Sequence, residues 1–395
     1  MTNIRVLVQG ASIAGPALAY WLRRYGAEVT VVEQAPGLRQ GGQAVDARGV
    51  AREVVRRMGL EAQVQAARTR TAGVQQVDAT GNVVHTERAE DQGGDGYVAE
   101  IEILRGDLAR VLHEATRDDV EHLFGDRVAA LAQDADGVDV TFAGGAQRRF
   151  DLVVGADGVH SSLRRMAFGP HESIVRHLGL VVAWFSLPNA FGLDRWLVEH
   201  AEGGRCAGLR PVQDTERAIA TLWFPAPAQA LDHRDAAGQK DLLRAGMAGF
   251  GWRTDEILGH VDDAGDFYLD ECAQVVLDRW SRGRVGLIGD AAYSASPMSG
   301  AGTGLALVGA FLLAGELAGA GWDPEAGFAG YQRRMQDYVD ANQEIGRMHV
   351  EHVLGPGPGE AAPEPDMEAL MPLIERAVTG PALPDYASPE TSRAR

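Results

Sequence analysis

The chain has 395 residues, 45% of them hydrophobic, and a formal net charge of −18. This size and composition are normal for one large or two ordinary soluble domains with a substantial core, and they give no sign of global disorder. The acidic balance argues against binding to nucleic acid or to an anionic membrane surface.

The N-terminal residues predict a strand–turn–helix–strand unit. Residues 4–8 form an apolar, β-branched run that is typical of a fully buried strand. Residues 10–15 predict a turn, and residues 16–25 predict a helix that opens with Pro16 and ends at Gly26. Residues 28–33 predict a second buried strand. A unit of this size matches a βαβ motif.

The rest of the chain divides into a strand-rich middle and a helical end. Helices are predicted over residues 50–58 and 104–115, and a "DADG" turn is predicted at residues 134–137. Strands are predicted over 152–155, 177–188, 218–224 and from Arg284, and helices from Gly302 and over 326–353. Residues 355–366 read as a Pro/Gly/acidic linker, 367–377 as a short amphipathic segment, and 381–395 as a disordered tail.

A glycine-rich turn after the first strand predicts a nucleotide site. Gly10 allows the sharp turn, Ser12 stands where a second glycine is usual, and Gly15 permits close packing of helix and strand. Free amides at the following helix N-terminus, around Ile13 and Ala14, would face a diphosphate. Glu33 at the end of the second strand can accept ribose hydroxyls and would repel a 2′-phosphate, which favours FAD or NAD at this site. The alternative is a plain glycine turn.

Two further blocks give these residues a family context. "DLVVGADGVHSSLRR" places Asp157 after a buried strand, and "GRVGLIGDAAYSASPMSGAGTGLAL" places Asp290 after another. With the first turn, their order resembles the class A flavoprotein aromatic hydroxylases, the single-component FAD monooxygenases of the p-hydroxybenzoate hydroxylase type. The resemblance extends to about residue 316.

This resemblance implies an α/β fold with a Rossmann-like FAD-binding domain (residues 1–168 and 272–354), a sheet-based substrate domain (169–271) and C-terminal helices. Residues 355–395 would form the linker, a short helix and the tail. FAD would bind non-covalently, with its pyrophosphate at the first turn, its ribityl chain at Asp290 and its ring over the amides of the later turn. The cofactor-binding residues implied are Gly10, Ser12, Ile13, Ala14, Gly15, Glu33, Arg39, Arg105, Val128, Asp157, Asp290, Pro297, Gly300, Ala301, Gly302 and Thr303.

The chain departs from the family at the last of these turns. Ala301 and Gly304 replace the Gln and Asn of a frequent GQGxN stretch, so backbone amides alone would hold the flavin there. An uncapped helix N-terminus is suited to the negative charge near N1 of a reduced flavin. The plainer alternatives are that Asp157 and Asp290 cap turns and that Arg39 and Arg105 are surface charges.

The strand-rich middle predicts a substrate site. Trp184, Trp223 and Arg210 lie in it, and with Pro297 they are the candidate substrate-binding residues. Strand alternation prevents Trp184 and Phe185 from sharing a sheet face. Ordinary core packing is the alternative for the aromatic residues, and solvation is the alternative for Arg210.

The resemblance implies a reaction that the cofactor carries. NADPH or NADH reduces the flavin, O2 adds at C4a, and the hydroperoxide hydroxylates an aromatic or polycyclic small molecule. No catalytic base and no metal site stand out among the 11 histidines. A flavin oxidase or dehydrogenase, or a flavoprotein that only sequesters a ligand, are the alternatives. Cys206 and Cys272 form no CxxC pattern and no signal peptide is visible, so a cytoplasmic protein is expected.

Overall fold

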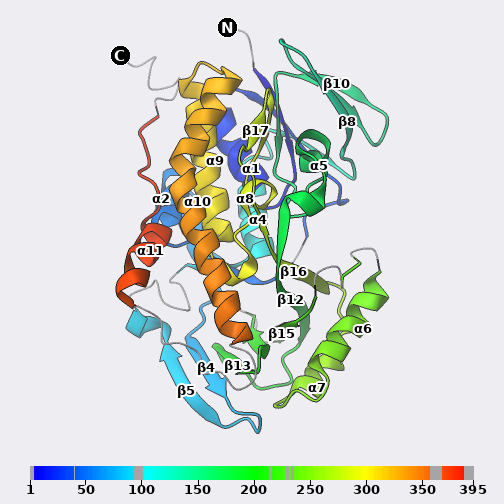
Figure 1. The fold of residues 1–395 in the computed structure, drawn as a ribbon, viewed down its shortest axis with the longest axis vertical. Coiled ribbons are helices and arrows are strands. Elements are labelled where there is room, and N and C mark those ends of the chain that lie inside the picture. Colours follow the sequence, from blue (N-terminus) through cyan, green and yellow to red (C-terminus); the bar gives the residue numbers. More distant parts are fainter. Residues whose placement is uncertain are drawn as a thin grey trace.

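A computed structural model describes residues 4–39, 41–92, 101–212, 216–227, 231–232, 235–355 and 367–386. Two main sheets lie toward opposite ends of the molecule, and the long helix α10 (Pro324–Leu354) runs beside both (Figure 1). This arrangement confirms the predicted α/β architecture with a Rossmann-like domain and a second sheet.

The first sheet has six strands and carries the predicted βαβ unit. Its centre is β1, which pairs in parallel with β2 on one side and with β11 on the other. Strands β1, β2 and β11 are almost wholly buried, which explains why they read as continuous apolar runs. In order, the strands are β17 (Ser281–Arg282), β18 (Val285–Leu287), β11 (Leu152–Gly155), β1 (Arg5–Gln9), β2 (Glu28–Glu33) and β7 (Glu121–Phe124).

Helices pack around this sheet, and all of them except α3 were predicted from the sequence. The helix α9 packs against α1 and α10, with α2 alongside. By length and composition α9 could cross a membrane, but 78% of it is buried inside the protein, so it is the core helix that the sequence predicts. The helices are α1 (Ala14–Arg24), α2 (Gly49–Arg57), α3 (Glu61–Ala66), α4 (Arg105–Glu114) and α9 (Gly302–Gly319).

The second sheet has seven strands and a covered outer face. The helices α6 (Ala236–Met247) and α7 (Thr254–Leu258) bury one face in a core that includes Phe185 and Phe224. The other face therefore turns toward the first domain. In order, the strands are β16 (Tyr268–Val275), β12 (Val175–Pro188), β15 (Arg217–Pro225), β14 (Arg205–Pro211), β13 (Trp196–Glu202), β4 (Gly73–Val77) and β5 (Val83–Arg88).

Two strands of this sheet come from outside the segment 169–271 that the sequence suggests for it. The strand β4 pairs in parallel with β13, with Gly73 opposite Trp196, and β5 pairs antiparallel with β4. A two-stranded ribbon of β3 (Ala44–Asp46) and β6 (Glu102–Leu104) also forms within this N-terminal region. Pairing between such distant segments leaves no local pattern in the sequence.

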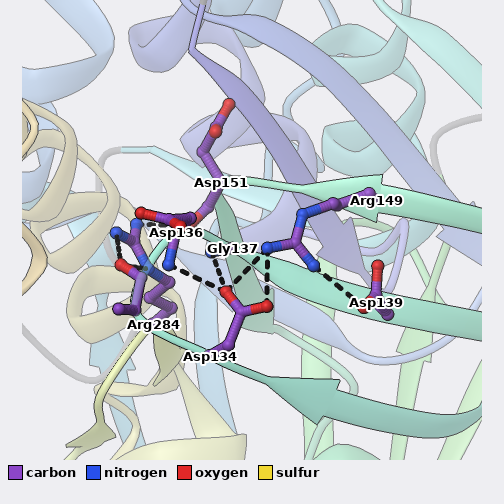
Figure 2. Close-up of polar contacts among 8 residues, drawn as sticks. Asp134, Asp136, Gly137, Asp139, Arg149, Asp151 and Arg284 are labelled. Carbon is purple, nitrogen blue, oxygen red and sulfur yellow. Dashed lines mark hydrogen bonds and ion pairs between the residues drawn. The ribbon is translucent and has the colours of Figure 1, made fainter.

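A third, antiparallel sheet lies beside β18, the strand that leads to the Gly-Asp turn, and is bonded to it through Arg284. It consists of β8 (Val128–Gln133), β9 (Val138–Phe142) and β10 (Gln147–Phe150). The predicted "DADG" turn joins β8 to β9. Arg149 Nη2 donates to both carboxylate oxygens of Asp134 in this turn, at 2.6 and 2.8 Å (Figure 2). Arg284, next to β18, donates to the carbonyl oxygens of Ala135 and Asp151. These bonds tie β18 to the turn.

The predicted disordered tail is wrong for residues 381–386. The Tyr386 ring lies 5.4 Å from the Phe311 ring, centroid to centroid, and its hydroxyl donates to Glu316 at 2.6 Å. Arg57 donates to the carbonyl of Pro384 at 3.0 Å. The polar composition of the tail predicts disorder, but one aromatic residue, Tyr386, anchors this part of the tail to α9. The linker 356–366 and residues 387–395 lie outside the described residues, whereas the amphipathic segment forms α11 (Met367–Thr379).

Removing this anchor should destabilise the protein. Gly315 lies directly under the Tyr386 ring, so Tyr386→Ala would uncover α9 and leave Glu316 without this donor. We expect a loss of about 1–3 kcal/mol in the free energy of unfolding, measured by urea denaturation. Tyr386→Phe, which keeps the ring, should lose about 1 kcal/mol or less. Equal stability of the Ala variant and the wild type would contradict this docking.

Candidate active site

The first predicted turn has no room for side chains at two of its glycines. Gly10 has φ +113°, and a Cβ there would lie 2.3 Å from the carbonyl oxygen of Ala156. A Cβ at Gly15 would lie 1.8 Å from the carbonyl oxygen of Gly10. The Gly15 contact brings the start of α1 tightly against the end of β1, as the fingerprint requires, and the Gly10 contact brings the turn against Ala156 after β11. Ser12 is partly exposed in the same turn.

The N-termini of α1 and α9, which follow the two glycine-rich turns, lack side-chain caps. The helix α1 starts after Ile13 and α9 starts after Ala301; neither cap residue bonds the first amides, and neither first turn holds an acidic residue. Uncapped amides with the helix dipole behind them attract anions. A Cβ at Gly289 would lie 3.0 Å from the Cβ of Ala14 in α1 and 3.9 Å from that of Ala306 in α9, so the first parts of both helices belong to one region of the fold.

Glu33, the predicted ribose ligand, is held beside the first turn. Its two carboxylate oxygens accept bonds from the backbone amides of Ala11 and Ala35, each at 2.9 Å. The carboxylate is therefore fixed in orientation, with lone pairs left for ribose hydroxyls.

Gln9, which the sequence analysis did not single out, bonds the block that contains Asp157. It is 3% exposed, and its amide nitrogen donates to Asp157 at 2.6 Å and to Ser162 at 2.9 Å. Its amide oxygen accepts from the backbone amide of Val128 at 2.7 Å. A polar residue that ends a buried strand just before the glycine turn was the available signal.

Asp157 bonds chiefly to protein groups. Besides Gln9, its carboxylate accepts from the hydroxyl of Ser161 at 2.5 Å and from the amide of Ser162 at 2.8 Å, at the start of α5 (Ser162–Phe168). These bonds favour the plainer interpretation, in which Asp157 caps the turn. A direct contact of Asp157 or Val128 with a cofactor stays a prediction.

Arg164 joins the second block to the third. Its side chain is completely buried, and it donates to the carbonyl oxygens of Val159 and Ala291. Ala291 belongs to α8 (Asp290–Tyr293), the first turn of the Gly-Asp block. Burial lowers the pKa of Arg164 to about 10, still well above neutrality, so a positive charge fixes the two blocks together.

Asp290 is exposed at the start of α8. Desolvation by the surrounding protein raises the pKa of its carboxyl, while Arg105 acts in the opposite direction. A Cβ at Gly302 would lie 3.8 Å from its Oδ1, so Asp290 faces the start of α9.

The predicted arginines lie in the same region. Burial lowers the pKa of Arg105, while the nearby Asp290 and Glu33 carboxylates raise it. Exposed Arg39 is close enough to act on the same group. The structure thus brings Glu33, Arg105 and Asp290 together from three separate segments.

Hydrogen bonds hold the loop before α9 against α10. It contains the short 3-10 turn Pro297–Ser299, and Ser296 and Gly300 both have positive φ, at 77° and 67°. Gln343 of α10 donates to the carbonyl of Ser294, and His349 bonds the carbonyl of Met298 at 2.8 Å. These bonds hold the loop that was predicted to face the flavin.

The second sheet presents aromatic residues to this loop. Trp184 and partly buried Trp223 share one small apolar cluster with Met298 of the loop. Phe185 and Phe224 lie in the opposite core beneath α6 and α7. Strand alternation therefore places the tryptophans on the face toward the first domain, as predicted.

Three residues on this side form a bonded set that the sequence did not reveal. The Tyr268 hydroxyl donates to Asp270 at 2.5 Å, and His160 bonds the other Asp270 oxygen at 2.9 Å. Burial raises the pKa of Asp270, but the bonds from His160 and Tyr268 outweigh burial and lower it. The set joins β16 to the Asp157 turn.

The residues present fit FAD. Two glycines admit no side chain, two helix N-termini offer unclaimed amides, and a carboxylate stands ready for a ribose. An elongated diphosphate cofactor supplies both an anion and hydroxyls to match these groups.

Closing the first turn should prevent cofactor binding. In Gly15→Ala the added Cβ would overlap the Gly10 carbonyl, so the turn must shift away from the pyrophosphate. We expect the dissociation constant for FAD to rise about ten- to hundred-fold or more, measured by flavin fluorescence during titration. Gly37→Ala is the matched control, since nothing lies within 4 Å of its Cβ. Unchanged affinity in the Gly15 variant would place FAD elsewhere.

A substitution that displaces the loop before α9 should change the fluorescence and reduction potential of bound FAD without preventing FAD binding. A Cβ at Gly346 would lie 2.1 Å from the carbonyl oxygen of Ala295 and 3.3 Å from Ser299. Gly346→Ala should therefore displace the loop, and the fluorescence and reduction potential of bound FAD should change. The control Gly319→Ala adds a methyl group at the end of α9 where nothing lies within 4 Å, and it should leave both unchanged. Identical flavin properties in both variants would contradict the role of the loop.

The chain is similar to known flavoproteins over most of its length. Residues 3–343 match the family described as "FAD binding domain". A flavin-dependent monooxygenase of Legionella longbeachae is 38% identical over 98% of this chain and 99% of its own length. An uncharacterized protein of Mycobacterium tuberculosis, Rv1260, is 44% identical over 93% of this chain and 98% of its own length.

Solved structures are similar across nearly the whole chain. Tetracycline destructase Tet(51) superposes with a TM-score of 0.86 at 36% identity, covering 98% of this chain and 99% of the other. The HpxO protein of Klebsiella pneumoniae, complexed with FAD and uric acid, has a TM-score of 0.75 at 23% identity, covering 96% and 97%. The latter likeness concerns the fold alone. The chain therefore belongs to the FAD-binding family of class A flavoprotein monooxygenases and is an FAD-dependent monooxygenase.

Proposed function

We propose that this protein uses NADPH or NADH and O2 to hydroxylate an aromatic or polycyclic small molecule. The observation that supports this most directly is the position of Trp184 and Trp223, on the sheet face that packs against the loop before α9. Flat apolar side chains beside a flavin loop suit a flat apolar substrate.

When bound, FAD supplies hydride acceptance and oxygen activation. The residues of the chain would position the FAD and the substrate and keep water away from the reacting atoms. Gly10, Gly15 and the amides of α1 would hold the pyrophosphate, Glu33 the ribose and Asp290 the ribityl chain. The uncapped start of α9, at Gly302 and Thr303, would face the charge that develops on the ring. Met298 and the tryptophans would shield the reacting edge from water.

The similarity to tetracycline destructases guides the choice of substrate. Their name states that they act on tetracycline, and Tet(51) shares 36% identity with this chain. A four-ring, oxygen-rich compound is therefore the first candidate among polycyclic substrates. A cytoplasmic location, where NAD(P)H is supplied, accords with this reaction and with the two free, buried cysteines Cys206 and Cys272.

Labelled oxygen distinguishes this reaction from the alternatives. The FAD-loaded protein should consume NADPH or NADH faster when tetracycline or a polycyclic phenol is added. With isotopically labelled O2, one labelled atom should appear in the product, detected by mass spectrometry. Oxidation of the substrate without label would indicate an oxidase or dehydrogenase. Tight binding with no stimulated consumption by any tested compound would indicate a sequestering protein.

A further inference from the structure

Arg210, the one arginine predicted to bind the substrate, forms a buried ion pair with Glu102. The Glu102 carboxylate is 4% exposed, and Arg210 bonds it directly through Nη1. The hydroxyl of Thr69 also donates to Glu102, and Thr71 donates to it at 2.7 Å. Arg210 in turn donates to the Thr71 hydroxyl at 3.0 Å. Both charges are therefore satisfied within the protein.

This pair links the second sheet to the segment that leads into α4. Leu209, next to Arg210 on β14, belongs to the core beneath α6 and α7, so Arg210 points to the opposite face, the side of Trp184. Glu102 begins β6, which leads directly to Arg105 at the start of α4. The ion pair thus joins the Trp184 face of the second sheet to the strand that precedes Arg105.

Further carboxylates lie near this ion pair. Asp46 stands opposite Glu102 in the β3–β6 ribbon and binds Arg48 at 2.6 Å. Burial raises the pKa of Asp46, while Arg48 lowers it. Glu199, buried on β13, pairs in register with Gly208 and so shares the sheet face of Arg210. Arg210 and Arg48 are thus each matched by a carboxylate, and Glu199 adds a further acid.

We infer that the substrate is a flat ring compound that carries no carboxylate. A substrate carboxylate would have to displace Glu102 from Arg210, leaving a buried charge without its partner, which is costly. Hydroxyl, carbonyl or amide groups meet no such barrier. The inference rests on the proposed function, because it names the substrate class of the same site.

Paired probes test this directly by binding rather than turnover. A hydroxynaphthoic acid and the corresponding hydroxynaphthamide differ only in charge, and their own fluorescence reports binding to the FAD-loaded protein. The wild type should bind the amide about ten-fold or more tightly than the acid. Glu102→Gln frees the Arg210 guanidinium, so it should improve binding of the acid by about ten-fold or more and leave the amide nearly unchanged. Glu102→Gln combined with Arg210→Gln should lose this gain.

Equal affinity of the wild type for both probes, or no gain for the acid in Glu102→Gln, would overturn the inference. The double variant, which removes both charges, provides a second test if Glu102→Gln does not fold. An arginine already serving a substrate carboxylate would make the acid bind selectively more weakly in the double variant than in the wild type, whereas we expect no such loss. A colourless protein, or one without labelled product, would instead contradict the proposed function, so the two failures are distinguishable.

Discussion

The structure depends on the close approach of α1 to the end of β1. Gly15 permits that approach, because a side chain there would collide with the Gly10 carbonyl, and Gly10 lets the turn pass close to Ala156 after β11. The approach leaves the first amides of α1 unclaimed and directs them toward the carboxyl ends of the parallel strands, where ligands bind in open α/β sheets. The first part of α9, which also lacks a side-chain cap, lies in the same region, because a Cβ at Gly289 would contact both Ala14 of α1 and Ala306 of α9.

Buried polar side chains hold the three motif blocks around this point. Gln9 connects the first block to Asp157, and Arg164 connects the Asp157 turn to the Gly-Asp turn. The long helix α10 then joins the Gly-Asp region to the second sheet, because Gln343 donates to the carbonyl oxygens of both Ser294 and Val275. The first domain and the second sheet are thus parts of one bonded framework, which suits the proposed reaction, in which a flavin edge and a substrate carbon must meet accurately.

Local features of the fold and site could be predicted because each has a short-range physical cause. The apolar run of β1, the glycines of the turn and the helical spacing of α1 and α9 are all visible within a few residues. The missing features were long-range: β4 joins β13, Tyr268 and Asp270 meet His160, and Arg210 meets Glu102. The tail was misjudged because one aromatic residue, Tyr386, outweighs its polar neighbours.

The most direct test of the account is the flavin content of the purified protein. The protein should be yellow, and heating should release FAD in an amount equal to that of the chain, since the glycine turns and helix N-termini hold it without a covalent bond. A protein that is colourless as isolated, and that shows no change in flavin fluorescence when FAD is added, would contradict the account at its foundation.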